Sequence, residues 1–151
     1  MIYIGVDPGA KGGYALLGSD GSITGYPWDA EAFVKHMRTA TMMRDMEGHS
    51  LIACVEKVGA MPGQGVTSMF TFGTNYGYIQ GVLSAFGIPF QLVSPHVWKK
   101  SYGLDSTKQK SIDVCKRLFP DLNLLATERS RVPSDGIAES ALLALYAKRH
   151  F

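Results

Sequence analysis

Short apolar runs punctuate this chain, and each run predicts a β-strand. The runs are bounded by Gly, Pro or Asp-Gly turns, and two of them end in an acid. The first three are joined by tight connections, so we expect them to form an antiparallel meander. The expected strands are residues 2–7, 14–17, 23–26, 51–56 and 88–93.

Longer stretches between these runs have the period of helices. Asp29 is a plausible N-cap for the first helix, and Ser134 for the last. Ser94-Pro95 opens a short helical turn, and either Ser106 or Thr107 caps the helix after it. The expected helices are residues 29–46, 67–86, 94–100, 107–119 and 134–149.

The helix expected over residues 67–86 has glycine at every fourth position of one face, at Gly73, Gly77 and Gly81. Each glycine costs a helix about 1 kcal/mol relative to alanine. Close approach of another backbone is the usual compensation. That backbone is either the protein's own sheet or a second copy of the chain, and the sequence leaves both open.

Composition sets the class of protein. A chain of 151 residues with 46% hydrophobic and 19% charged residues is expected to form one globular domain, residues 1–151. No apolar run reaches about 18 residues and no signal peptide is evident, so we expect a cytoplasmic protein without a membrane span. Cys54 and Cys115 lie far apart in apolar stretches, which favours buried free thiols over a zinc site.

Charge is unevenly distributed along the chain. Residues 1–90 hold 5 Lys/Arg and 7 Asp/Glu, whereas residues 91–151 hold 10 and 6. The net charge is therefore −2 in the first part and +4 in the second. This asymmetry hints at a polyanionic partner for the C-terminal part.

The last helix carries two acids on one face of its first turns, Asp135 and Glu139, ahead of a run of Ala and Leu that must be buried. Two unit charges about 4 Å apart repel by about 4 kcal/mol at an effective dielectric of about 20. A divalent cation would offset this repulsion economically. The alternative is a solvated first turn, in which both acids meet the positive end of the helix dipole.

Two further acids, Asp7 and Glu56, each end a buried strand. Adjacent parallel strands would place them at the same edge of the sheet, where sites of α/β proteins form. Together with Asp135 and Glu139 they would carry a charge of about −4, which two Mg²⁺ or Mn²⁺ ions would neutralise. A two-metal carboxylate site suits phosphodiester hydrolysis.

The order of these motifs resembles the RuvC-like Holliday junction resolvases of the ribonuclease H-like superfamily, especially their short phage and organelle branch. The resemblance covers nearly the whole chain. Its pieces are Ile4-Gly5-Val6-Asp7-Pro8-Gly9 with Gly12-Gly13, Val55-Glu56, Phe72-Gly73 with Gly77 and Gly81, Pro95-His96-Val97-Trp98-Lys99, Thr107-Lys108-Gln109-Lys110 with Phe119-Pro120, and Asp135-Gly136-Ile137-Ala138-Glu139-Ser140-Ala141-Leu142-Leu143.

The resemblance implies an α/β fold with a mixed five-stranded sheet flanked by helices. It also implies a homodimer that makes paired, Mg²⁺-dependent nicks in four-way DNA junctions, in the cytoplasm of a bacterial or phage-infected cell. Asp7 would bridge two metal ions, and Glu56, Asp135 and Glu139 would complete the ligand set. Many bacterial members have an Asp three residues after the preceding acid, or a nearby His, where this chain has Glu139 at four, so the relative roles of Asp135 and Glu139 stay open.

Basic residues of the second half are the expected DNA contacts. Lys99 and Lys108 match positions that the family uses near the scissile phosphate, whereas Lys116 and Arg117 are expected to be solvated cations. Met61 or Phe70 could act as a wedge at the junction, although Phe70 is expected in the core. The expected phosphate contacts are Lys99, Lys100, Lys108, Lys110, Arg129 and Arg131.

Three other functions are alternatives to a junction resolvase. A broader nuclease for branched DNA would use the same site. A nucleic-acid-binding module of the same fold would have lost its acids, and all four are present. A sugar-kinase or actin-like phosphotransferase needs two such domains, and 151 residues are too few. No small-molecule cofactor is expected.

Overall fold

The computed structural model describes residues 1–60 and 62–151, and in them the chain forms one mixed sheet. The strand order is β3-β2-β1-β4-β5, with the first three strands antiparallel and β1, β4 and β5 parallel to one another. The predicted α/β fold and meander are confirmed. The strands are β1 (Ile2–Asp7), β2 (Gly13–Gly18), β3 (Ile23–Pro27), β4 (Leu51–Glu56) and β5 (Phe90–Val93).

The helices begin and end within a few residues of the predicted bounds. Asp29 Oδ1 accepts the Ala32 N–H at 2.7 Å, and Ser134 Oγ accepts the Ile137 N–H at 3.2 Å, so both expected caps are formed. The helices are α1 (Ala30–Glu47), α2 (Val66–Ala85), α3 (Pro95–Ser101), α4 (Lys108–Leu118) and α5 (Asp135–His150). Within the described residues, no helix is both long and apolar enough to cross a membrane.

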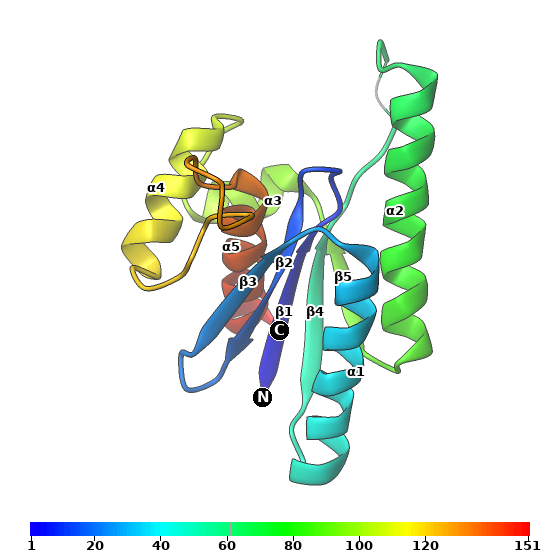
Figure 1. The fold of residues 1–151 in the computed structure, drawn as a ribbon, viewed down its shortest axis with the longest axis vertical. Helices are drawn as coiled ribbons and strands as arrows, with labels where there is room; N and C mark the ends of the chain where they lie inside the picture. Colours follow the sequence, from blue (N-terminus) through cyan, green and yellow to red (C-terminus); the bar gives the residue numbers. More distant parts are fainter. Residues whose placement is uncertain (61) are drawn as a thin grey trace.

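The sheet lies between two helical layers (Figure 1). Helices α1 and α2 cover one face, where Ile4 and Val6 pack with Phe33 of α1 and Leu83 of α2. Helix α5 lies on the other face with α3 and α4 beside it, around a core that includes both cysteines. Cys54 and Cys115 are buried and free, as predicted.

Helix α5 approaches β1 closely because Gly5 lacks a side chain. A Cβ at Gly5 would lie 2.0 Å from the Ser140 carbonyl oxygen and 2.3 Å from the Ala144 nitrogen. At the start of α5, a Cβ at Gly136 would lie 2.2 Å from the Lys11 carbonyl oxygen. The two glycines therefore let the first turns of α5 rest against the end of β1 and the turn after it.

The glycine face of α2 points away from the sheet. A Cβ at Gly73, Gly77 or Gly81 would meet no atom of the described residues within 4 Å. Of the two alternatives that the sequence leaves open, packing of these glycines on the protein's own sheet is therefore excluded for the described residues. The reason is that Ile79 and Leu83, on the opposite side of α2, supply the large apolar side chains that fill the core.

Phe70 shares the outer face of α2 and is 78% exposed, next to Val66 at 86%. Its predicted place in the core is wrong for the same reason, because α2 turns its larger apolar side toward the sheet. Met61, the other wedge candidate, lies outside the described residues.

Candidate active site

The carboxylates of Asp7 and Glu56 are neighbours at one edge of the sheet. Strands β1 and β4 pair in parallel with Val6 opposite Val55, and the next residue of each strand is the acid. The close seating of α5 brings Asp135 and Glu139 to the same edge. All three other carboxylates act electrostatically on Asp7, so the structure brings the four predicted acids together.

Asp7 lies at the centre of this group. Burial of its carboxyl, followed by repulsion from Glu56, raises its pKa to about 7, and Glu139 and Asp135 add to the rise. A single hydrogen bond opposes these effects, from the Gly9 N–H to Oδ1 at 3.1 Å. Asp7 is thus a partly buried acid whose pKa is raised by three neighbouring acids.

Glu56 is oriented by a tryptophan that sequence reasoning had not assigned to the site. The indole N–H of Trp98, a fully buried side chain, donates to Glu56 Oε2 at 2.8 Å. Burial raises the pKa of Glu56, and this hydrogen bond works against that rise. Trp98 directly precedes Lys99, a predicted site residue, and this adjacency could have indicated from the sequence that Trp98 lies near the site.

Glu139 is buried and has two partners. Ser111 Oγ donates to its Oε1 at 2.9 Å, and Lys99 Nζ lies at 2.9 Å from the same oxygen. The Lys99 side chain is only 18% exposed. Ser111 was not a predicted site residue, although its position three residues after Lys108 on α4 places both on one helix face.

Asp135 has a more open environment. Lys108 Nζ lies 2.9 Å from its Oδ2, with the lysine side chain 70% exposed. Hydrogen bonding to Asp135 raises the pKa of Lys108. The two lysines predicted to lie near a scissile phosphate, Lys99 and Lys108, thus each hold one of the α5 acids.

A metal ion can be tested against this donor set. In the described part of the chain, no three Asp, Glu, His or Cys side chains converge closely enough to hold an ion as they stand. Two of the four acids are held by lysines and a third by the Trp98 indole. Hard carboxylate oxygens are nonetheless what Mg²⁺ prefers, and the repulsion around Asp7 is what a cation would relieve.

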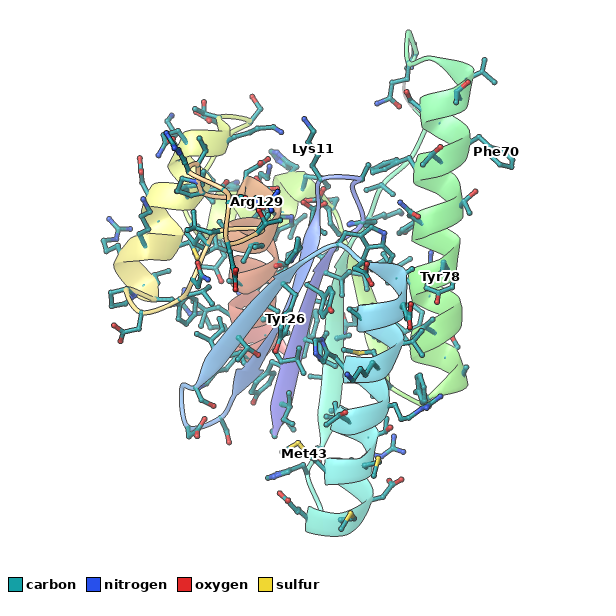
Figure 2. The ribbon with its side chains drawn as sticks, in the orientation of Figure 1. Lys11, Tyr26, Met43, Phe70, Tyr78 and Arg129 are labelled. Carbon is teal, nitrogen blue, oxygen red and sulfur yellow. The ribbon has the colours of Figure 1, made fainter. Side chains whose placement is uncertain are left out.

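The remaining predicted DNA contacts lie on α3, α4 and the loop before α5. Lys100 is exposed beside Lys99, and Arg129, which Figure 2 labels, and Arg131 are exposed in the loop. Lys110 is paired with Asp105 instead of the four acids. Lys116 and Arg117 are exposed, as expected.

Sequence reasoning had also missed Lys11. This exposed residue projects from the turn between β1 and β2, at the edge of the sheet where β1 ends (Figure 2). It lines one pocket together with Asp135.

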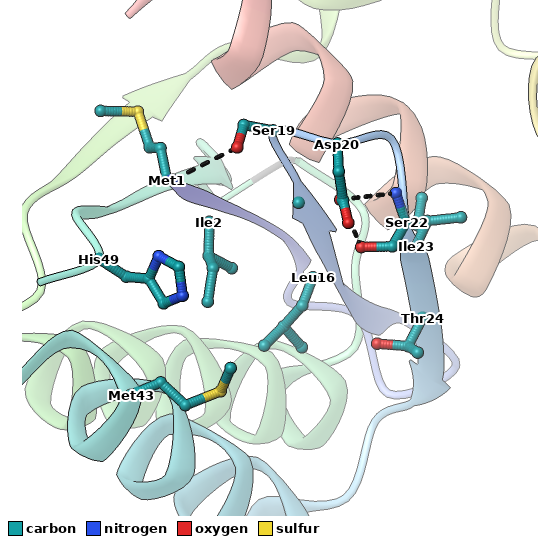
Figure 3. A pocket seen from close by; sticks show the side chains of 11 residues that line it. Met1, Ile2, Leu16, Ser19, Asp20, Ser22, Ile23, Thr24, Met43 and His49 are labelled. Atoms are coloured by element: carbon teal, nitrogen blue, oxygen red, sulfur yellow. Dashed lines mark hydrogen bonds between the residues drawn. The ribbon is translucent and has the colours of Figure 1, made fainter. Parts of the chain in front are cut away.

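A pocket lies at the other end of the strands, away from the four acids. It measures about 440 Å³ and is lined by residues at the start of β1 and the end of α1, including Met1, Met43 and His49 (Figure 3). None of the predicted site residues lines it. Among the described residues, cavity size alone therefore does not locate the acids.

Comparison with known proteins gives the fold independently. No protein-family model and no curated protein matches the chain. Solved structures do: Thermus thermophilus RuvC in complex with a Holliday junction substrate is 14% identical with a TM-score of 0.59, and a second T. thermophilus RuvC structure is 14% identical with a TM-score of 0.50. Each match covers 99% of this chain and 96% of the other.

The yeast mitochondrial Holliday junction resolvase Ydc2 is also 14% identical, with a TM-score of 0.42 over 93% of this chain and 76% of that one. The two T. thermophilus structures establish that this chain has the RuvC fold. The resemblance expected from the order of the motifs is confirmed at the level of the fold.

Proposed function

We propose that this protein is a structure-specific endonuclease that cuts branched DNA, with four-way junctions as its main substrate. The observation that carries the proposal is the gathering of Asp7, Glu56, Asp135 and Glu139 at one edge of a RuvC-type sheet. The RuvC structure with a Holliday junction supports the choice of substrate.

The four acids would hold divalent ions, two Mg²⁺ in the favoured arrangement and Mn²⁺ as a substitute. Bound ions would supply the charge stabilisation that phosphodiester hydrolysis needs. Because Lys99 and Lys108 now hold Glu139 and Asp135, ion binding requires these acids to exchange lysine for metal. The released ammonium groups would then be free to neutralise the phosphate of the strand being cut.

The other residues of the site orient the acids. The Trp98 indole fixes Glu56, the Ser111 hydroxyl fixes Glu139, and the Gly9 amide fixes Asp7. Holding ligands by hydrogen bonds from neighbouring groups is how metal sites set ligand orientation. Lys100, Arg129 and Arg131, which are exposed on the same side of the sheet as α5, would contact flanking phosphates.

We further propose that the active form is a homodimer, because paired nicks in two strands require two sites. The outer face of α2 suits the contact, since Val66 and Phe70 are exposed apolar side chains and Gly73, Gly77 and Gly81 leave the backbone open. Small residues at this spacing allow two helices to approach closely.

One assay tests the function directly. Purified protein is incubated with four-way, Y-shaped and linear duplex DNA, with Mg²⁺ or with a chelator. We expect cutting of the four-way junction only with Mg²⁺, and loss of cutting but not of junction binding in Asp7→Asn. Asp113→Asn, which changes an exposed acid of α4, serves as the matched control.

The alternatives give different results. Equal cutting of Y-shaped and four-way DNA would identify a general nuclease for branched DNA. Junction binding without cutting under any metal would identify a non-catalytic binding module. If the protein neither binds nor cuts any of the three DNAs, the proposal is contradicted.

A further inference from the structure

A pocket of about 330 Å³ opens beside one of the four acids, Asp135, which is part of its wall. It lies between the β1–β2 turn, the end of β3 and the loop that precedes α5. Its other walls include Lys11, Pro27, Trp28, Val132 and Pro133. This volume lies in the range of pockets that bind small organic groups.

Trp28 reaches this pocket because of the sheet topology. Strands β1 and β3 both run antiparallel to β2, so both end at the same edge of the sheet. Trp28 directly follows β3, and its backbone N–H donates to the Gly12 carbonyl oxygen at 3.0 Å. This bond fixes Trp28 beside the turn that follows Asp7.

The indole ring is held by three neighbouring rings, none of which is parallel to it. Phe33 packs against it at an interplanar angle of 51°, and Tyr14 and Tyr78 meet it at 83° and 79°. Thus no aromatic ring in the described residues lies flat on the indole. Trp28 is partly exposed and held in one position by an aromatic cluster, which is a rigid platform.

The chemistry of the walls selects the occupant. Pro27, Pro133 and Val132, which is 74% exposed, offer apolar surface, and Lys11 contributes a cation at the mouth. Apolar and aromatic walls next to a cation fit a planar ring attached to an anionic chain. Nucleotides of a DNA strand have this form, and their bases stack on aromatic side chains in single-strand sites.

We propose that this pocket receives one unstacked nucleobase next to the phosphodiester that is cut, with Trp28 as its stacking partner. The inference rests on the proposed function and assigns Trp28 as a specificity-determining residue of the same site. A base–aromatic stack contributes roughly 10-fold to affinity or rate. The pocket would make cutting depend on a base at one defined position.

The experiment uses junctions with a single abasic residue, placed in turn at each nucleotide flanking the mapped cut. For the wild type we expect kcat/KM to fall roughly 10-fold at one flanking position. Trp28→Leu, which keeps apolar bulk but removes the flat ring, should lower cutting of the intact junction by a similar factor. The abasic residue should then cost this variant nothing more.

Two variants serve as controls. Trp28→Phe keeps an aromatic ring and should retain most of the dependence on the base. Tyr26→Leu removes another ring of the aromatic cluster that does not line the pocket, and should keep the full abasic penalty. Thermal unfolding midpoints identify any variant that has lost its fold. If Trp28→Leu has lost it, Trp28→Met, which also lacks a flat ring, replaces it in the comparison.

The outcomes separate the inference from the proposed function. If the wild type cuts junctions but the abasic penalty is the same in wild type, Trp28→Leu and Trp28→Phe, the pocket assignment is overturned and the nuclease stands. If the wild type neither binds nor cuts any junction, both fail together.

Discussion

At the scale of single residues, Asp7 lies in an environment that destabilises its charged carboxylate. Its carboxyl is surrounded by three other acids and receives one backbone hydrogen bond. A domain is stable by only about 5–15 kcal/mol, so the destabilisation of a partly buried acid such as Asp7 is a noticeable fraction of the total. Such a group is expected where a cation completes the structure.

The first prediction concerns Asp7→Asn in metal-free protein. The folded-state pKa of Asp7 is about 7, against 3.8 for an ordinary Asp. Below pH 4 both the folded and unfolded chains keep the proton, so Asp7 costs no stability. Between pH 4 and 7 the unfolded chain loses the proton first, and stability falls as pH rises.

Above pH 7 this loss of stability is complete. Removing the negative charge of Asp7 should restore the lost stability. We expect Asp7→Asn to be more stable than the wild type by about 2–4 kcal/mol at pH 8 and nearly equal to it at pH 4. Urea unfolding in the presence of a chelator measures both. A difference independent of pH, or equally present in Asp113→Asn, would contradict this reading of Asp7.

The second prediction concerns Lys99, which competes with a cation for Glu139. Its Nζ lies 2.9 Å from Glu139 Oε1 in a nearly enclosed position. We expect Lys99→Met to bind Mg²⁺ several-fold more tightly by titration calorimetry, because Glu139 loses its fixed counter-charge. Cutting at saturating Mg²⁺ should fall, because the phosphate loses a cation.

Lys100→Met is the matched control, since Lys100 is exposed and lies in the same helix. It should leave the Mg²⁺ affinity unchanged. Weaker Mg²⁺ binding by Lys99→Met would mean that Lys99 supports the site instead of competing for it.

At the scale of elements, α2 is the helix whose composition its own fold does not explain. Its inner side is filled by Ile79 and Leu83, while its outer side presents Phe70 and three glycines to solvent. An isolated domain gains nothing from glycine at exposed helix positions. Association of two chains through this face would explain the pattern.

The third prediction separates the two effects of glycine. A methyl group at Gly77 meets no described atom within 4 Å, so Gly77→Ala should stabilise the monomer by about 1 kcal/mol. The same change should weaken the dimer, because the helices can no longer approach as closely. Urea unfolding at low concentration and sedimentation equilibrium measure the two effects.

Thr39→Ala on α1 is the control for this prediction. Thr39 is exposed, so its replacement should raise helix stability without changing association. If Gly77→Ala leaves the dimer unchanged, or if the wild type is monomeric on DNA, the outer face of α2 is not the contact.

At the scale of the whole molecule, the basic part of the chain covers the same face of the sheet as the helix that carries Asp135 and Glu139. The C-terminal part of the chain, with net charge +4, supplies α3, α4, the loop and α5, and these pack on the face of the sheet beside the acids. The N-terminal part, with net charge −2, supplies most of the opposite layer. A polyanion would therefore approach from the α5 side.

The fourth prediction follows from this distribution. Junction affinity should fall steeply as salt is raised, because phosphate contacts release counterions. Lys100→Ala should reduce the slope of log K against log salt by about 1, whereas Lys116→Ala should leave it unchanged. Fluorescence anisotropy with labelled junctions measures the slopes, and a flat salt response in the wild type would contradict a phosphate-led interface.

Much of this architecture could be predicted from the sequence. The strands, the caps at Asp29 and Ser134, and the position of Asp7 and Glu56 at strand ends follow from local periodicity and turn chemistry. Parallel pairing then brings two acids to one edge by a general rule of sheets. Asp135 and Glu139 share a helix face by spacing alone.

The tertiary structure decided what the acids touch and which way α2 faces. Trp98 meets Glu56 across 42 residues and Ser111 meets Glu139 across 28, and no local pattern encodes such contacts. The roll of α2 about its axis, which exposes Phe70 and the glycines, depends on the competing fit of its two sides to the sheet. Periodicity fixes which residues share a face, and only packing against the rest of the chain fixes where that face points.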